Sequence, residues 1–195
     1  MWNERYAIDE YVYGEKPNSF LEEHTSMLSG KVLSLAEGEG RNAVFLASLG
    51  LEVLGVDASN VGLAKAQKLA VSRGVDIQTE VADLREFTPT ENHYDAVISI
   101  SAHLPSTIRS RLYPLVERCL KSGGILILEA YSEAQQTRDT GGPKDIDMLM
   151  SEAKIRTELP NLQPILLKEV ERDVSEGRYH TGLASVVQFI GRKKD

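Results

Sequence analysis

The stretch Leu33-Ser-Leu-Ala-Glu-Gly-Glu-Gly-Arg-Asn-Ala43 decides the fold, because it joins two patterns of different period. An apolar run over residues 31–36 predicts a buried strand, and residues 42–49 predict a helix. Gly38 and Gly40 lie between them, and without a Cβ their backbone can adopt positive φ and approach a ligand closely. In an open parallel sheet, such a turn borders the crevice where ligands bind.

The same alternation of strand and helix continues along the chain and predicts a mostly parallel sheet with helices on both faces. Ser59 is expected to cap the next helix and Gly74 to end it, and Pro114 is expected to kink or interrupt a later one. After a further helix over residues 146–153, two strands joined by a turn at residues 175–178 predict an antiparallel hairpin. The seven predicted strands cover residues 31–36, 51–56, 75–81, 94–100, 125–129, 165–173 and 183–190.

The composition is that of a globular protein, with 42% hydrophobic and 26% charged residues among 195. We expect a single domain over residues 1–195, made of an N-terminal cap segment (residues 1–30) and a core (residues 31–195). The net charge of −7 and the scattered Lys and Arg residues disfavour a nucleic-acid partner. No apolar run approaches the ~20 residues of a membrane span. With one cysteine and no signal-peptide pattern, we expect a cytoplasmic protein, either a monomer or a homodimer.

Two carboxylates follow consecutive predicted strands after the glycine turn. Asp57 ends the second strand, where a carboxylate can accept hydrogen bonds from both hydroxyls of a ribose. Asp83 ends the third strand, where it could accept the exocyclic amine of adenine while the Leu84 amide meets a ring nitrogen. Each aspartate alone is more often a solvated strand end or a helix cap, but together they describe an adenosine site. The spacing Gly38-x-Gly40-x-x-Ala43 also fits a dinucleotide fingerprint or a tight structural turn, so these alternatives stay open.

Five segments, in this order along the chain, resemble the motifs of class I methyltransferases. They are residues 33–47, 53–59, 81–83, 94–100 and 122–124. A second set of motifs resembles the tellurite-resistance (TehB-like) branch of that family. It consists of Gly40-Arg-Asn-Ala-Val-Phe-Leu-Ala47, His103-Leu-Pro105, Glu129-Ala-Tyr131, Gln135 and Gly141-Gly-Pro143. The resemblance extends over nearly the whole chain and implies a Rossmann-like, doubly wound α/β fold.

The resemblance implies S-adenosylmethionine as the methyl donor, with S-adenosylhomocysteine as the product. It implies that Gly38 and Gly40 lie near the methionine part of the donor, Asp57 at its ribose and Asp83 at its adenine. The full set of expected donor contacts is Ala36, Glu37, Gly38, Gly40, Asn42, Asp57, Ala58, Asp83, Leu84 and Ser101.

Two positions depart from the pattern of the family, which often has aspartate and glycine where this chain has Ser34 and Ala36. Because alanine resists positive φ, Ala36 is expected to shift the backbone slightly. Glu37 and Glu39 add negative charge beside the positive sulfonium of the donor. We expect Glu39 to point into solvent, whereas Glu37 could do the same or support the donor electrostatically.

Methyl transfer from a sulfonium needs the alignment of nucleophile, methyl and sulfur, and the exclusion of water. A general base is needed only if the acceptor is protonated at the working pH, so the lack of an obvious triad does not argue against an enzyme. His103 and Tyr13 are the candidate catalytic residues, although His103 could equally pack in a loop. The candidate acceptor contacts are Tyr6, His103, Tyr131 and Gln135.

The aromatic N-terminal segment resembles a cap over the donor, where ring faces would attract a sulfonium. The four histidines are isolated from one another, so no metal site is expected. Together these features predict methyl transfer to a small-molecule acceptor, such as a thiol or a chalcogen species. Two alternatives remain, an NAD-dependent oxidoreductase and a non-catalytic protein that binds S-adenosylmethionine.

Overall fold

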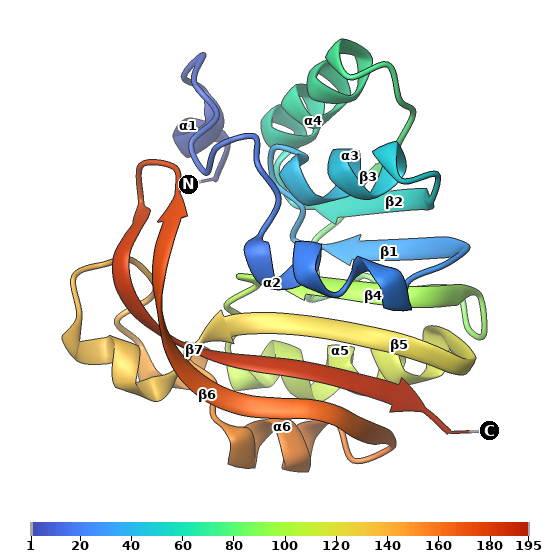
Figure 1. Cartoon of the computed structure of the whole chain (residues 1–195), viewed down its shortest axis with the longest axis vertical. Helices are drawn as coiled ribbons and strands as arrows, with labels where there is room; N and C mark the ends of the chain where they lie inside the picture. Colours follow the sequence, from blue (N-terminus) through green and yellow to red (C-terminus); the bar gives the residue numbers. More distant parts are fainter. Residues whose placement is uncertain (1, 195) are drawn as a thin grey trace.

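A computed structural model describes residues 2–194, which form one seven-stranded sheet with the strand order β3-β2-β1-β4-β5-β7-β6 (Figure 1). The strands are β1 (Lys31–Leu35), β2 (Glu52–Asp57), β3 (Gln78–Val81), β4 (Tyr94–Ile100), β5 (Leu120–Tyr131), β6 (Leu162–Glu176) and β7 (His180–Lys193). Strands β1 to β5 are parallel, and β7 pairs antiparallel with both β5 and β6. The predicted doubly wound α/β sheet with a C-terminal antiparallel hairpin is confirmed.

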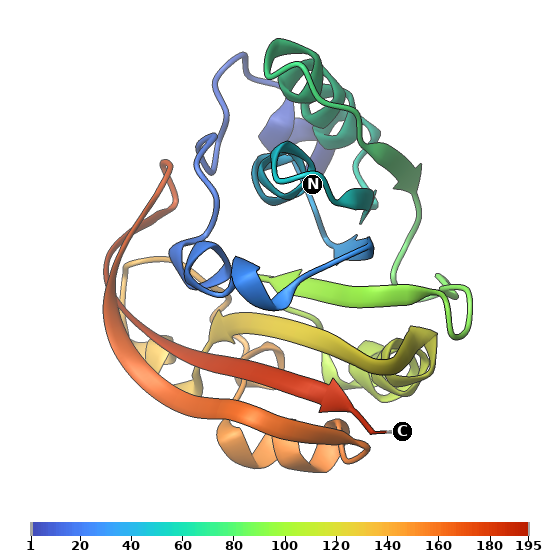
Figure 2. The same ribbon diagram turned by 45° about the vertical axis from the view of Figure 1, so that its right-hand side comes forward.

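Helices cover both faces of this sheet (Figure 2). The α-helices are α1 (Trp2–Tyr6), α2 (Ser19–Glu23), α3 (Arg41–Ser48), α4 (Asn60–Ser72), α5 (Ser106–Cys119) and α6 (Glu152–Glu158). Neighbouring residues of β1 point to opposite faces, so Val32 packs in a cluster with α3 and α4, whereas Leu33 packs in a cluster with α5 and α6. Within residues 2–194, no helix has the length and apolar content that a membrane crossing needs.

One helix prediction is wrong, and one of the two alternatives given for Pro114 is excluded. The helix expected over residues 146–153 is divided, because Ser151 accepts a hydrogen bond from the Lys154 N–H and caps a separate helix, α6. A short 3-10 helix, Ile146–Met148, precedes it. Pro114 does not interrupt α5, which continues through it, since Leu112 and Val116 on either side are fixed in the core. Packing therefore outweighs the single backbone hydrogen bond that the proline removes.

The C-terminal hairpin is longer than predicted and reaches back to the N-terminal segment (Figures 1 and 2). At its tip the Arg178 N–H donates to the Val12 carbonyl over 2.9 Å. Gly177 has a φ of +69°, and a Cβ there would lie only 2.3 Å from the Val12 oxygen. The N-terminal segment and the tip of the hairpin therefore meet beyond the carboxyl ends of the parallel strands.

Gly40 fixes the distance between α3 and α4. It caps α3 with a φ of +94°, and an added Cβ would lie 2.6 Å from both the Cα and the Cβ of Ala66. No side chain fits between the turn and the α4 backbone. The glycine turn therefore serves helix packing as well as the cavity described below.

Gly40→Ala should lower the free energy of unfolding by about 3 kcal/mol, because it adds a steric overlap to an unfavourable positive φ. Gly50→Ala is the matched control, since Gly50 also has a positive φ (+87°) but has open space around its Cβ position. The control should lose only about 1 kcal/mol. Urea denaturation followed by circular dichroism measures both values, and equal losses would contradict the packing role of Gly40.

Candidate functional site

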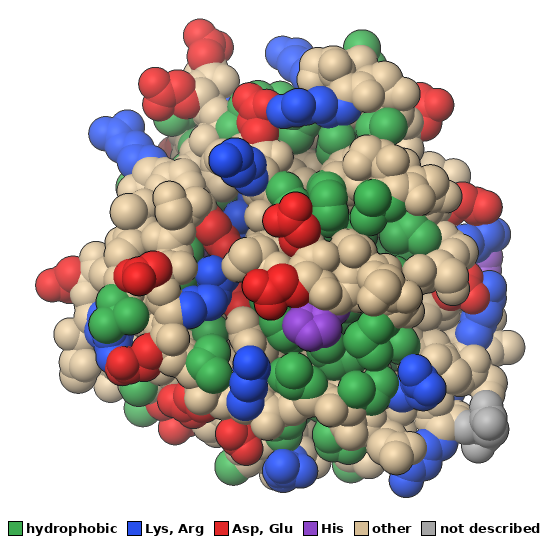
Figure 3. All heavy atoms as spheres, in the orientation of Figure 1, with side chains coloured by type: hydrophobic (Ala, Val, Ile, Leu, Met, Phe, Trp, Pro, Cys, Tyr) green, Lys and Arg blue, Asp and Glu red, His purple; other side chains and the backbone are tan. Residues whose placement is uncertain are grey.

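A cavity of about 850 Å³ lies at the carboxyl ends of β1, β2 and β4. Its floor is the glycine turn after β1 and the loops that follow the next strands, and its roof is the N-terminal segment with the hairpin tip. The volume falls within the range of about 300–1,000 Å³ typical of small-molecule and cofactor sites. On the face shown in Figure 3, acidic and basic side chains are interspersed, without a continuous basic field.

Most of the predicted site residues line this cavity. They are Tyr6, Tyr13, Ala36, Glu37, Gly38, Asn42, Asp57, Ala58, Asp83, Leu84, Ser101 and His103. Gly40 does not, because it lies beneath α4. Tyr131 lines a smaller cavity next to the first. Gln135 is buried and does not reach the main cavity, since its amide donates to Thr140 Oγ1 (2.9 Å) and to the Gly141 carbonyl (3.0 Å).

Asp57 ties two loops together at the floor of the cavity. Its Oδ2 accepts the Gly38 N–H over 2.9 Å, and its Oδ1 accepts the Ser59 N–H over 2.7 Å. Burial raises the pKa of this carboxyl, and the backbone hydrogen bonds oppose the rise. A carboxylate oxygen has more than one acceptor site, so Asp57 can still accept hydroxyl groups of a ligand.

Asp83 lies at the rim of the cavity and is largely exposed. Its Oδ1 accepts the backbone N–H of Arg85 over 2.9 Å, and the Arg85 guanidinium lies 3.1 Å from Oδ2. These contacts hold the pKa of Asp83 below its ordinary value. The carboxylate is therefore ionised at neutral pH and available as a hydrogen-bond acceptor at the edge of the cavity, beside the buried Leu84.

Glu37 is buried in the turn and holds it in shape. Its Oε1 accepts the Ala43 N–H over 2.9 Å, and its Oε2 accepts the Ser34 hydroxyl. The glutamate thus caps the start of α3, and Ser34 has a partner at the position where the family often has aspartate. Burial raises the pKa of Glu37. The next departure, Ala36, adopts a φ of +52°, a conformation that costs an L-residue about 1–2 kcal/mol.

Glu39 does not point into solvent, and that expectation is wrong. Its side chain is buried, Oε2 accepts the Val12 N–H over 2.8 Å, and Oε1 lies 2.5 Å from Lys65 Nζ. The same Nζ donates to the carbonyls of Ile8 (2.9 Å) and Glu10 (2.6 Å). Glu39 and Lys65 therefore fix the N-terminal segment to the core.

Aromatic side chains form the roof. Tyr6 packs over Gly38 and Gly62, where an added Cβ would lie 2.8 Å and 2.9 Å from its atoms. Tyr13 accepts a hydrogen bond from Arg5 Nη1 over 2.9 Å, and the same guanidinium lies over the ring of Tyr179 from the hairpin tip. The N-terminal segment and the hairpin tip thus both contribute side chains to the cavity wall.

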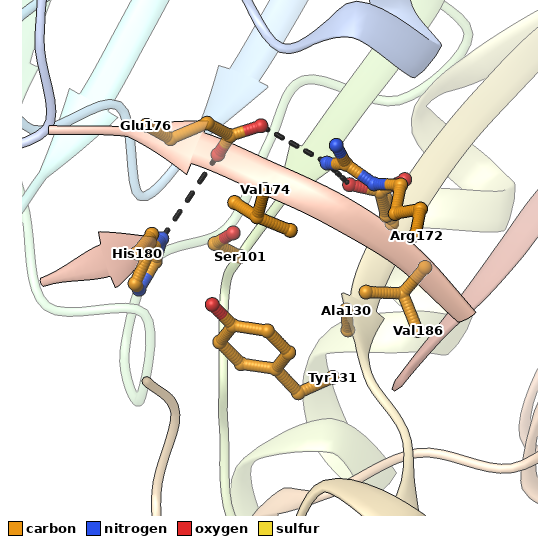
Figure 4. Close-up of a pocket in the computed structure, with 9 residues that line it drawn as sticks. Ser101, Ala130, Tyr131, Arg172, Val174, Glu176, His180 and Val186 are labelled. Atoms are coloured by element: carbon orange, nitrogen blue, oxygen red, sulfur yellow. Dashed lines mark hydrogen bonds and ion pairs between the residues drawn. The ribbon is translucent and has the colours of Figure 1, made fainter. Parts of the chain in front are cut away.

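The sequence analysis missed His180, Arg172 and Glu176, which line the smaller cavity together with Tyr131 (Figure 4). They border a cavity of about 10 Å³, large enough for one water molecule. His180 lines both cavities, and its Nδ1 lies 3.9 Å from Glu176 Oε2. Although burial opposes ionisation, the nearby His180 imidazole and hydrogen bonds from Arg41 and Arg172 hold the pKa of Glu176 well below its ordinary value. No short motif marks these residues, because the hairpin brings them to the site from the end of the chain.

His103 follows β4 and faces the main cavity. The backbone N–H of Tyr131 donates to its Nε2 over 3.1 Å, and the two rings stack with centroids 5.1 Å apart. Burial and the nearby His180 lower the pKa of His103 to about 3. Among residues 2–194, no group of three or more His, Cys, Asp or Glu side chains is arranged to hold a metal ion.

The sequence matches a protein-family model and known relatives, and the fold matches solved structures. Residues 32–124 match a family model described as a methyltransferase domain. The 2-heptyl-1-hydroxyquinolin-4(1H)-one methyltransferase of Mycobacteroides abscessus is 26% identical over 120 residues, 60% of this chain and 53% of that protein. YqeM of Bacillus subtilis is 34% identical over 107 residues, 53% of this chain and 43% of that protein. The chain thus spans about half the length of these two relatives.

Solved structures match over almost the whole chain. TehB from Haemophilus influenzae has a TM-score of 0.76 at 18% identity, covering 99% of this chain and 66% of that one. A second match has a TM-score of 0.76 at 19% identity and covers 98% of this chain and 88% of that one. Its structure was described under the heading of the conversion of a disulfide bond into a thioacetal group during echinomycin biosynthesis. At these identities the likeness shows the fold alone.

Glu37→Gln should leave the free energy of unfolding at pH 7 within about 1 kcal/mol of the parent. Its amide can accept from Ala43 and donate to Ser34 without placing a charge in a buried turn. Glu37→Ala, which loses both partners, should cost about 2 kcal/mol. Urea denaturation measures both, and equal losses in the two variants would show that the charge itself is required.

The parent and Glu37→Gln also test how the free energy of unfolding depends on pH. Because the pKa of Glu37 is raised in the folded state, the folded protein binds more protons than the unfolded chain between the two pKa values. The parent should therefore lose stability as pH rises from the unfolded pKa of about 4.3 through the folded pKa. Glu37→Gln should lack that loss in denaturation curves recorded across the window.

Proposed function

We propose that this chain, whose residues 32–124 match a methyltransferase-domain family model, transfers a methyl group from S-adenosylmethionine to a small-molecule acceptor. One observation carries the proposal. Gly38, Asp57 and Asp83, which follow three consecutive strands, line one end of a single cavity of about 850 Å³. The domain match favours S-adenosylmethionine over NAD as the nucleotide that this end binds.

The residues present fit an adenosine sulfonium. Asp57 would accept the ribose hydroxyls, while Asp83 and the Leu84 amide would meet the adenine at the rim. The turn at Gly38 presents backbone rather than side chain to the methionine part, and Tyr6 closes over it. When bound, S-adenosylmethionine supplies an electrophilic methyl group on a positively charged sulfur.

The chain itself contributes alignment, shielding and electrostatics. Tyr6 and Tyr13 in the roof would exclude water and attract the sulfonium through their ring faces. The acceptor end of the cavity is bordered by the loop after β4 and is largely apolar. Its apolar lining comprises Ile100, Ala102, Leu104, Pro105, Ile108, Pro143 and Met148. A cavity of this size has room for a small acceptor beside the donor.

For the acceptor, we favour a thiol or a reduced chalcogen species. The motifs that resemble the tellurite-resistance branch support this choice, and the fold is shared with TehB from Haemophilus influenzae. The cavity is also compatible with a nucleophile that needs no deprotonation, because its acidic side chains already have partners. Fold likeness alone does not fix a substrate, so the acceptor needs its own test.

The proposal is tested first by calorimetric titration with S-adenosylmethionine, S-adenosylhomocysteine and NAD. We expect saturable binding of the first two and none of NAD, followed by turnover in a panel of thiols and reduced selenium and tellurium compounds. Binding of NAD alone would replace the proposal with an oxidoreductase. Donor binding without turnover of any small molecule would instead indicate a protein that only binds the nucleotide.

Asp57→Ala should raise the dissociation constant for S-adenosylmethionine at least fivefold, equivalent to about 1 kcal/mol, because it removes a charged hydrogen-bond acceptor from the ribose. Glu52→Ala is the control, since Glu52 is exposed at the other end of the same strand. Calorimetry of both variants checks the result. Unchanged donor affinity in Asp57→Ala would remove this residue from the donor site.

A further inference from the structure

The hydrogen bond to His103 settles which of its ring nitrogens carries the proton. The Tyr131 backbone N–H points at Nε2 over 3.1 Å, and an amide N–H can only donate. Nε2 must therefore offer its lone pair, and the neutral ring carries its proton at Nδ1. No described hydrogen bond uses Nδ1, and the side chain lines the main cavity. The nitrogen of this imidazole that has no described partner therefore carries an N–H and not a lone pair.

The surroundings keep the ring neutral. Parallel stacking on Tyr131, with an interplanar angle of 9°, holds the ring so that protonated Nε2 would face the amide N–H. His180 of β7 meets the edge of the same tyrosine, and Glu176 of β6 is already bound to Arg41 and Arg172. No described hydrogen bond or ion pair joins the His103 imidazole to a carboxylate that could favour its cationic form.

The other acidic groups on the cavity do not offer a free base either. Glu37 binds Ser34 and Ala43, and Glu39 binds Val12 and Lys65. The remaining acids, Asp57 and Asp83, lie at the donor end and accept backbone N–H groups. His180 is the other imidazole on the cavity, so it is the alternative proton acceptor that an experiment has to distinguish from His103.

We propose that His103 donates a hydrogen bond from Nδ1–H to the nucleophilic atom of the acceptor, and that the site selects acceptors that arrive ionised, namely thiolates and the corresponding chalcogenolates. This inference rests on the proposed methyl transfer. The acceptor's lone pair forms the new bond to the methyl carbon, and the old carbon–sulfur bond breaks with its electron pair left on the sulfur of S-adenosylhomocysteine. No proton passes to the protein, because the acceptor loses its proton to water before it binds.

The tautomer of His103 can be determined by NMR in the absence of a methyl acceptor. Histidine labelled with ¹⁵N in the intact chain, with His103→Gln used for assignment, should give the signature of a neutral Nδ1–H ring that does not titrate above pH 5. A neutral ring protonated at Nε2, or a midpoint between pH 6 and 7, would overturn the inference. Either result is independent of turnover.

The acceptor class is tested by the pH dependence of kcat/KM with an aryl thiol and an alkyl thiol of different pKa. We expect the midpoint to shift with the pKa of the thiol. His103→Phe, which keeps the stacking but lacks the N–H, should lose about tenfold in kcat/KM and keep the same midpoints. His103→Gln, which keeps an N–H, should lose less.

Two other outcomes would contradict the inference. A midpoint that is the same for both thiols would indicate an enzyme base, His103 if it disappears in His103→Phe and His180 if it persists there and disappears in His180→Gln. Donor binding with turnover of neutral amines or alcohols, but of no thiol, would overturn the selection of ionised acceptors. Failure to bind S-adenosylmethionine at all would instead refute the proposed function.

Discussion

The carboxylate of Asp57 is the group on which the cavity end of the sheet depends. One oxygen holds the Gly38 N–H and the other holds the Ser59 N–H, so the turn after β1 and the start of α4 keep a fixed spacing. Ser59 in turn caps α4 by accepting from Gly62 over 3.0 Å. Burial of the charge is unfavourable, and the two backbone hydrogen bonds offset part of that cost. The residue predicted to bind a ribose thus also shapes the place where a ribose would lie.

On the hairpin side of the cavity, a buried group of charged side chains holds the surrounding segments in place. Glu129 of β5 accepts hydrogen bonds from Asn18 (2.8 Å) and Arg172 (2.5 Å), and Glu176 binds Arg172 (3.0 Å) and Arg41 (2.7 Å). Two carboxylates and two guanidinium groups balance in charge, which buried ions require. Because Asn18 belongs to the N-terminal segment and Arg172 to the hairpin, the group also joins the two parts of the roof to the sheet.

Sequence reasoning succeeded where the signal and its partner are close in the chain. The helix cap at Ser59 and the positive φ of Gly38 follow from local patterns, and the strand alternation predicts the sheet. It failed for Glu39, whose partners Val12 and Lys65 lie 27 and 26 residues away, because a glutamate in a turn looks the same whether it is solvated or buried. His180 was missed for the same reason, since only the long hairpin carries it to the cavity. Long-range partners are a property of the tertiary structure, and a single sequence holds no local trace of them.

The distribution of hydrogen bonds around the cavity bears on what chemistry the site can perform. Its carboxylates each accept hydrogen bonds or ion pairs from the protein, and His103 has its lone pair engaged by the Tyr131 backbone. A site built in this way contributes geometry and exclusion of water, which are the main demands of displacement at a sulfonium methyl group. The same hydrogen bonds that stabilise the fold therefore restrict proton transfer to the protein. In the methyl transfer proposed above, reactivity would then come from the ionisation of the acceptor, and selectivity from the N–H of His103.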